Sequence, residues 1–166
     1  MNELPTRKPI RLRGYDYGQN GAYFITVCTE GKRKILSDIF VGQGLAPAEI
    51  RLTPYGEIAE RQILDLENRY PCIRIDKYVI MPNHIHMIVM IQNETAGASP
   101  CPTIADVMCV YKSLTTRMCN KRRYIGKLFQ TSYHDHIIRG EHDYAEIWRY
   151  IDENPQKWTL DEYYQK

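Results

Sequence analysis

The sequence lacks the features that would assign its 166 residues to a secreted or membrane class. Its five cysteines are odd in number and contain no Cys-x-x-Cys pair, which argues against a disulfide framework and against a thiolate zinc site. We therefore expect reduced thiols that pack as small apolar residues. No apolar run is long enough to cross a bilayer, and residues 1–8 lack the apolar core of a secretory signal. These absences predict a cytoplasmic protein.

The chain also has little net charge, +2, which by itself does not indicate a nucleic-acid partner. The charge is unevenly distributed, however. Residues 105–139 carry seven basic and two acidic side chains, a balance of 7 − 2 = +5, whereas residues 140–166 carry three basic and seven acidic ones, a balance of 3 − 7 = −4. The basic stretch is therefore a candidate surface for an acidic partner.

What is present is ordinary for a globular protein, with 43% apolar and 25% charged residues. A chain of this length fits one domain, so we expect a single domain over 1–166 with a basic arm at about 1–18.

Periodicity and capping residues predict seven elements in the order strand, helix, strand, strand, helix, strand, helix. This order is a split βαβ unit repeated once. It predicts the α+β class, with a ferredoxin-like antiparallel sheet, helices on one face and an extra C-terminal helix. The expected strands cover 22–29, 73–81, 84–91 and part of 129–139, the expected helices cover about 53–70, 103–122 and 141–153, and the expected loops cover 41–49 and 92–102.

His84 and His86 form a His-x-His motif in a predicted strand, where alternate side chains share one face. The two imidazoles therefore lie close enough to chelate a metal ion. The alternative is two half-buried histidines that hydrogen-bond locally, and a short motif does not decide between the two.

A second His-x-His motif, His134 and His136, also lies in a strand-like segment. The first motif directly follows a tight turn on an expected central strand, whereas the second leads into the last helix. We therefore expect His84 and His86 to bind metal, and His134 and His136 to have a structural or substrate-contacting role.

Tyr150 and Asn154 lie at the end of the last predicted helix, four residues apart and so on one helical face. The tyrosine hydroxyl has a pKa of about 10 and is a poor nucleophile at neutral pH. A divalent ion on the histidines, with the Asn154 carbonyl as third ligand, can polarise a phosphate for attack. Oxygen ligands favour Mg²⁺ or Mn²⁺. The alternative is that Tyr150 packs in the core and Asn154 caps the helix.

The basic stretch lies on and beyond the second predicted helix. Basic residues with interleaved tyrosines suit phosphate contacts and base stacking, although the same residues can also form an ordinary solvated helix face. The candidate DNA-binding residues are Lys112, Arg117, Lys121, Arg122 and Arg123, together with Arg11 and Arg13 of the N-terminal arm.

Taken together, several segments strongly resemble the single-tyrosine HUH transposases, and within them most closely the REP-associated tyrosine transposases. They follow one another in the family's order and cover most of the chain. They are RLRGYDY at 11–17, AYFIT at 22–26, YVIMPNHIH at 78–86, YKSLT at 111–115, SYHDHIIR at 132–139 and YIDENP at 150–155.

The resemblance implies an HUH nuclease fold in which His84 and His86 bind the metal, Asn154 completes the site and Tyr150 is the nucleophile. It also implies a cytoplasmic, nucleoid-associated enzyme that cuts single-stranded DNA near hairpins, forms a 5′-phosphotyrosine and rejoins strands without ATP. The absence of a glycine-rich phosphate loop agrees with this. Homodimer formation stays open, as does whether Tyr150 serves its own subunit or a partner.

Two other functions also remain open from the residues. One is a metal-dependent phosphodiesterase that uses water in place of Tyr150. The other is a non-catalytic nucleic-acid binding module in which the histidines are structural.

Overall fold

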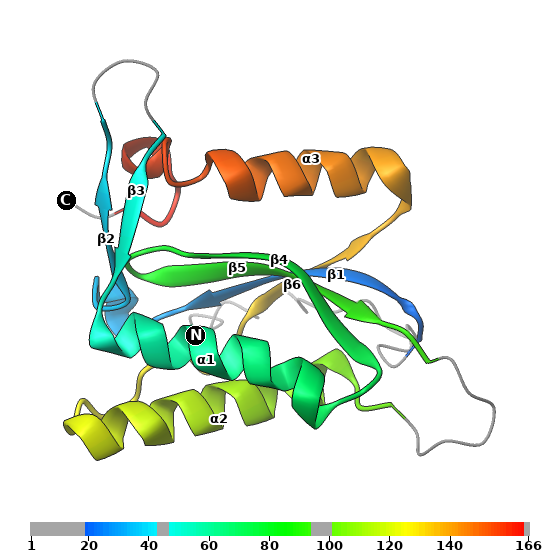
Figure 1. Ribbon diagram of the computed structural model, residues 1–166, viewed down its shortest axis with the longest axis horizontal. Coiled ribbons are helices and arrows are strands. Elements are labelled where there is room, and N and C mark those ends of the chain that lie inside the picture. The colour runs from blue at the N-terminus through cyan, green and yellow to red at the C-terminus, as the bar shows by residue number, and fades with distance from the viewer. Residues whose placement is uncertain (1–18, 43–46, 94–100, 165–166) are drawn as a thin grey trace, which may run out of the picture.

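Four antiparallel strands form the central sheet of the computed structural model, which describes residues 19–42, 47–93 and 101–164. The strands are β1 (Gly21–Cys28), β4 (Ile73–Ile80), β5 (His84–Ile91) and β6 (His134–Ile138). Their order across the sheet is β4-β5-β1-β6 (Figure 1), so β5 and β1 are central strands and β4 and β6 are edges.

Helices cover both faces of this sheet (Figure 1). α1 (Pro54–Arg69) and α2 (Ile104–Arg122) pack on one face, and α3 (Gly140–Glu153) lies on the other. The first two helices begin at threonine caps: the Thr53 side chain accepts a hydrogen bond from the backbone of Gly56, and Thr103 forms a capping box with Asp106. Such caps satisfy backbone donors that have no partner inside the helix. These helices therefore begin where the sequence predicted.

The two faces of β5 differ, and this difference positions the site. Ile85, Met87 and Val89 point into the main core with α1 and α2. His84, His86 and Ile88 alternate with them and point toward α3 and the C-terminal segment. Alternation in one strand thus separates the apolar core from the histidine face.

The predicted fold class, an α+β ferredoxin-like sheet with two helices on one face and an extra C-terminal helix, is confirmed. The predicted element boundaries agree with the observed ones to within about two residues, apart from the broad segment 129–139, of which only 134–138 is strand. The expected N-terminal arm, with Arg11 and Arg13, lies outside the described residues. The single-domain organisation therefore stays a prediction.

The sequence did not predict a separate two-stranded ribbon, β2 (Ser37–Phe40) and β3 (Glu49–Leu52), on either side of the expected loop. Each strand has only four residues, too few for alternation to distinguish a strand from a loop. The sequence also gave no indication of two short 3-10 helices, η1 (Glu30–Lys32) and η2 (Trp158–Leu160). The second of these leads the C-terminal segment back toward β5.

The expectation of five reduced thiols was wrong for two of them. Cys72 and Cys101 form a disulfide with their Cα atoms 6.2 Å apart, while Cys28, Cys109 and Cys119 are free. The two partners are 29 positions apart and form no local motif. Tertiary packing alone brings the start of β4 beside the segment that precedes α2.

A search of the described helices for one long and apolar enough to cross a membrane finds none.

Candidate functional site

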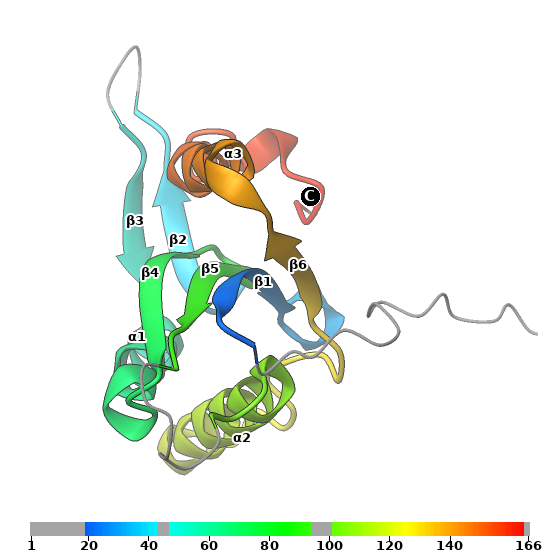
Figure 2. The same cartoon turned by 90° about the vertical axis from the view of Figure 1, so that its right-hand side faces the viewer.

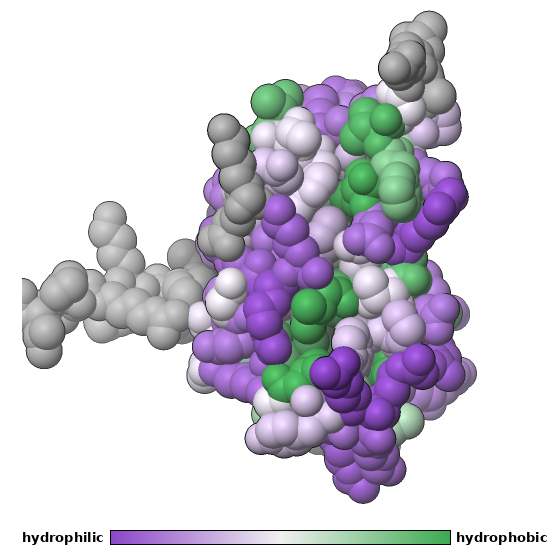
Figure 3. Space-filling model, turned by 90° about the vertical axis from the view of Figure 1, so that its left-hand side faces the viewer, coloured by the Kyte–Doolittle hydropathy of each residue, from purple (hydrophilic) through white to green (hydrophobic). Residues whose placement is uncertain are grey.

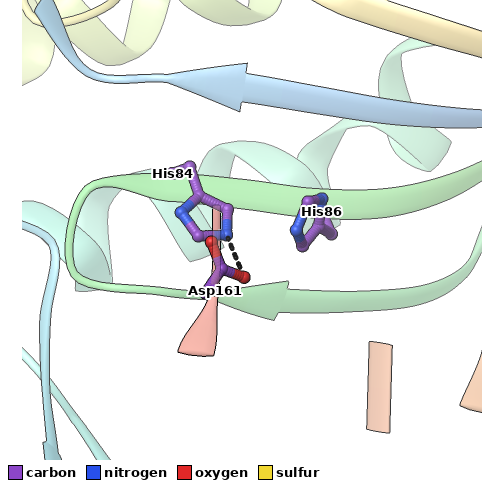
Figure 4. Close-up of side chains that lie close together, drawn as sticks. All are labelled: His84, His86 and Asp161. Carbon is purple, nitrogen blue, oxygen red and sulfur yellow. Dashed lines mark ion pairs between the residues drawn. The ribbon is translucent and has the colours of Figure 1, made fainter. Parts of the chain in front are cut away.

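Three buried side chains meet on the histidine face of the sheet. His84 and His86 project from β5, and Asp161 reaches them from the segment after α3 (Figure 4). The ligand atoms of the three side chains all lie within 4.8 Å of one another, and His84 Nε2 is 3.9 Å from Asp161 Oδ2. Two imidazole nitrogens and a carboxylate oxygen are a donor set that can hold a divalent metal ion. We call these three residues the metal group.

Hydrogen bonds orient both imidazoles. The Asn83 amide nitrogen donates to the Tyr163 carbonyl, so Asn83 Oδ1 is free to accept from His84 Nδ1 at 2.9 Å. This bond leaves His84 Nε2 as the unprotonated nitrogen, directed at Asp161. His86 Nδ1 lies 2.8 Å from the Thr26 hydroxyl, which leaves its Nε2 toward the open side of the site. Bonds of this kind commonly fix the orientation of metal-binding histidines.

Asn154 joins the group through its amide. Its nitrogen donates to Asp161 Oδ2 at 2.8 Å, and the side chain is almost fully buried. Asn154 Oδ1 and His84 Nε2 are both buried acceptors that have no hydrogen-bond partner within the described ranges. Each such atom costs about 1–3 kcal/mol when nothing compensates it. A cation bound between them would satisfy both, so the residues fit a metal site.

Burial keeps the two histidines neutral. It lowers the pKa of His84 to about 3, with a smaller contribution from the positive charge of Lys32. It also lowers the pKa of His86 well below the usual value, with His84 as the second cause. Neutral imidazole is the form that binds metal. No proton therefore has to leave either ring at neutral pH before an ion binds.

Tyr150 stands directly beside this group. Its hydroxyl lies 3.4 Å from His86 Nε2, and 40% of the residue is exposed. The pKa of Tyr150 is raised to about 12, mainly by burial and to a smaller extent by the negative charges of Asp161 and Glu162. The phenol is therefore fully protonated at neutral pH. It needs a nearby positive charge before it can act as a nucleophile.

A cleft of about 450 Å³ opens in front of Tyr150, which we call the tyrosine cleft. The second histidine pair lines it: His134 and Thr26 are register partners, and Thr26 is also the partner of His86. Directly opposed residues share a face, so His86, Thr26 and His134 form one row across three strands. His136 is bonded to Asp143 at 3.0 Å. The second pair thus lines the same cleft as His86, but only the first pair belongs to the metal group identified among the described residues.

The predicted DNA-binding residues of α2 lie on the other side of the sheet from Tyr150. Lys112 is partly buried, while Arg117, Lys121, Arg122 and Arg123 are exposed. Figure 3 faces the end of the molecule where α2 ends, and hydrophilic residues gather at the bottom of this view, below patches of hydrophobic ones. The structure therefore brings Tyr150, Asn154 and the first histidine pair together, and sets the basic helix apart from them.

Sequence reasoning missed Asp161. It lies seven residues after Asn154, beyond the end of α3, where helical periodicity no longer applies. It reaches the histidines only because the turn at η2 folds the chain back. A carboxylate in an acidic tail gives no local signal of this role.

Comparisons with known proteins bear on the fold and the family. No family model matches the chain. An uncharacterised protein of Haemophilus influenzae (strain Rd) is 31% identical, over 95% of this chain and 93% of its own. A solved structure of the REP-associated tyrosine transposase bound to a REP hairpin has a TM-score of 0.65 at 20% identity, covering 91% of this chain and 75% of that one. A candidate transposase from Deinococcus radiodurans R1 has a TM-score of 0.51 at 18% identity, covering 86% and 95%. The expected resemblance is confirmed at the level of the fold.

Proposed function

The chain belongs to the same family as the Haemophilus influenzae protein and has the fold of the solved transposases, and from this premise we propose that it is a transposase that cuts single-stranded DNA through Tyr150. The observation that carries the proposal is the 3.4 Å approach of the Tyr150 hydroxyl to His86. His86 belongs to a buried metal group, so the proposed nucleophile lies directly beside the proposed metal site.

In this proposal His84, His86 and Asn154 hold a divalent ion, Mg²⁺ or Mn²⁺, with Asp161 as a further oxygen ligand. When bound, the ion supplies positive charge that polarises the scissile phosphate and offsets the raised pKa of the phenol. Tyr150 loses its proton and its oxygen bonds to phosphorus, while the bond to the 3′-oxygen of the preceding nucleotide breaks. The products are a 5′-phosphotyrosine and a DNA end with a 3′-hydroxyl, which takes up a proton. Because the phosphodiester energy is kept in the adduct, the reverse attack rejoins DNA without ATP.

Single-stranded DNA with a hairpin is the proposed substrate. The related solved transposase is bound to a REP hairpin, which supports this choice. Lys112, Arg117, Lys121, Arg122 and Arg123, with Arg11 and Arg13 of the arm, are the proposed phosphate contacts. An enzyme with this substrate works at the nucleoid in the cytoplasm.

Tyr150 acts in cis in this proposal, because its hydroxyl lies beside the histidines of its own chain. A homodimer is therefore not required for a complete site. In this proposal the second histidine pair does not bind metal but contacts the DNA that occupies the tyrosine cleft.

The test uses labelled single-stranded hairpin DNA, Mn²⁺ and a denaturing gel. The wild-type protein forms a covalent protein–DNA band, and Tyr150→Phe binds the DNA but forms none, because it lacks the nucleophilic oxygen. Tyr70→Phe, at the end of α1 and away from the site, is the matched control and keeps the band.

The same gel separates the alternatives. Cleavage without an adduct in both proteins would indicate a water-dependent phosphodiesterase. Binding without cleavage in any divalent ion would indicate a non-catalytic module. An adduct that persists in Tyr150→Phe would assign the nucleophile to another residue.

A further inference from the structure

A second hollow, of about 350 Å³, lies between α2 and the segment that leads into β6. Three cations line it: Lys112, Arg117 and Lys127. Polar groups complete its wall, among them Asn120 and Thr131. We call it the basic hollow. Lys121, Arg122 and Arg123, at the C-terminal end of α2, do not line it.

The basic hollow holds like charges close together. The Lys112 ammonium donates to the Thr131 carbonyl at 2.7 Å, and the Lys127 ammonium donates to the Thr131 hydroxyl at 2.8 Å. Both groups therefore converge on one residue. Burial lowers the pKa of Lys112, and the charge of Lys127 lowers it further. Two ammonium groups held this way repel each other, and an anion bound between them would offset this repulsion.

The local carboxylates offset this charge only in part. Glu30 pairs with Lys127 at 2.9 Å, and within the described part of the chain no ion pair involves Lys112 or Arg117. Arg117 is exposed and can move toward a ligand. Two lysines and an arginine around one small hollow suit a phosphate group.

A series of neighbouring hollows that share lining residues leads from this place to Tyr150. The tyrosine cleft shares four lining residues with a smaller neighbouring hollow of about 270 Å³: Thr26, His134, Glu162 and Tyr163. Gln130 lines that smaller hollow and also the basic hollow. The path therefore runs from the face of α3, past residues 130–134, to the face of α2.

This path passes around an edge of the sheet. β6 is an edge strand, and the connection from α2 rises into it (Figure 2). A strand of DNA can cross from one face to the other here without passing through the core. The basic helix is thus within reach of DNA bound at Tyr150, although the sheet separates the two.

The geometry points to a single path for the DNA: the strand that is cut at Tyr150 continues past Gln130 and His134 and places one of its backbone phosphates among Lys112, Arg117 and Lys127. This inference rests on the proposed function and adds to it the course of the substrate strand. It distinguishes the cations of the basic hollow from those at the end of α2.

The test compares DNA lengths in the Tyr150→Phe background, so that binding is measured without cleavage. Fluorescence anisotropy gives the affinity for a hairpin with a short single-stranded flank and for hairpins with longer flanks on either side. We expect one of the two extensions to tighten binding in this protein. We expect the same extension to have little effect when Arg117→Ala and Lys127→Ala are added.

Salt dependence supplies a second readout. Each phosphate contact on single-stranded nucleic acid contributes about 0.7 to the slope of log affinity against log salt, so the double change lowers the slope by about 1.4 for the extended DNA only. Between about 50 and about 200 mM salt, its affinity then falls about sevenfold less than that of the parent. Arg61→Ala with Arg69→Ala, two exposed arginines of α1, is the matched control and keeps the parent slope. The milder Arg117→Gln, which keeps the exposed side chain polar, gives half of the change if the double variant unfolds.

Extensions that tighten binding equally in the parent and the double variant, with equal salt slopes, would overturn the inference. The proposed function is judged separately, by adduct formation of the protein with Tyr150 restored on the short-flank hairpin. An adduct on short DNA together with no effect of the basic hollow would refute the strand path alone. No adduct on any DNA would refute the proposed chemistry, while the slopes would still decide whether bound DNA follows this path.

Discussion

At the residue scale, the metal group depends on which atom of each ring is free. Asn83 and Thr26 occupy the Nδ1 atoms of His84 and His86, and this directs both Nε2 atoms into the site. The orientation of the ligands is therefore built before an ion arrives. Residues that only orient ligands commonly change metal affinity by about 10- to 100-fold when they are replaced.

Mn²⁺ binding tests this arrangement directly. His84→Ala or His86→Ala abolishes high-affinity binding, and Asn83→Ala weakens it by about 10- to 100-fold because His84 loses its orientation. His134→Ala, on the same cleft but outside the metal group, keeps the wild-type affinity. Isothermal titration calorimetry measures all four. Loss of metal binding in His134→Ala would mean that the second pair is the ligand set.

Stability should also depend on pH through the buried rings. The pKa of His84 is about 3 in the folded protein and near 6.5 when unfolded, so the unfolded state binds more protons between these values. The contribution of the neutral ring to the free energy of unfolding is fully present above about pH 6.5. Below that pH it decreases by about 1.4 kcal/mol for each unit by which the pH is lowered.

Urea denaturation without metal at pH 7 and at pH 5 measures this slope. His84→Gln should lower the slope, because an amide does not titrate, while His86 keeps its own contribution. His142→Gln, which changes an exposed histidine of α3, is the matched control. Equal slopes in all three proteins would show that His84 is not held neutral by burial.

At the scale of elements, α3 positions both site residues of this segment, because Tyr150 lies in its last turn and Asn154 is its C-cap. Its attachment to the edge strand β4 involves an ion pair of Lys77 with Asp152, the Lys77 ammonium over the Trp148 ring at 4.4 Å, and a hydrogen bond from Tyr144 to Asp76 at 2.6 Å. Lys77 thus makes two of these contacts. They determine where the helix places the phenol relative to β5.

Lys77→Ala should therefore slow adduct formation without weakening metal binding. Misplacing a reacting group by about 1 Å can cost up to about 100-fold in rate, and we expect roughly tenfold here. Single-turnover kinetics on the denaturing gel measure the rate. Arg69→Ala removes a comparable surface ion pair on α1 and should keep the wild-type rate. An unchanged rate in Lys77→Ala would show that other contacts position α3.

At the scale of the whole molecule, the sheet separates the proposed catalytic site from the basic residues of α2. The metal group and Tyr150 lie on the α3 face, and the basic helix lies on the other (Figure 1). The disulfide between Cys72 and Cys101 joins the start of β4 to the chain just before α2, and both cysteines pack against the main core. It therefore stabilises the fold on the core side.

Reducing this disulfide should lower the stability but leave the site intact. Closing a loop of this length contributes about 3–4 kcal/mol through the entropy of the unfolded chain. Thermal unfolding of oxidised protein should therefore occur several degrees higher than that of Cys72→Ala with Cys101→Ala, while the Mn²⁺ affinity stays equal. Cys109→Ala, an exposed free thiol, is the control. Identical melting temperatures would argue against the bond.

The sequence by itself determined the element order, the helix starts and the shared faces within single elements. The cap at Thr53, the alternation of His84 and His86 in a strand, and the four-residue spacing of Tyr150 and Asn154 are all local. Local geometry has a fixed period, so it can be predicted from the chain alone. The two short strands of the ribbon were not predicted, because four residues are too few to show the alternation of a strand.

Only the tertiary structure decided which distant residues meet. It brought Asp161 to His84, placed Thr26 between His86 and His134, joined Cys72 to Cys101 and set a series of neighbouring hollows between Tyr150 and the basic hollow. These contacts depend on how strands pair and how the chain turns back after α3. No sequence period records such pairings, because they follow from packing the whole chain at once.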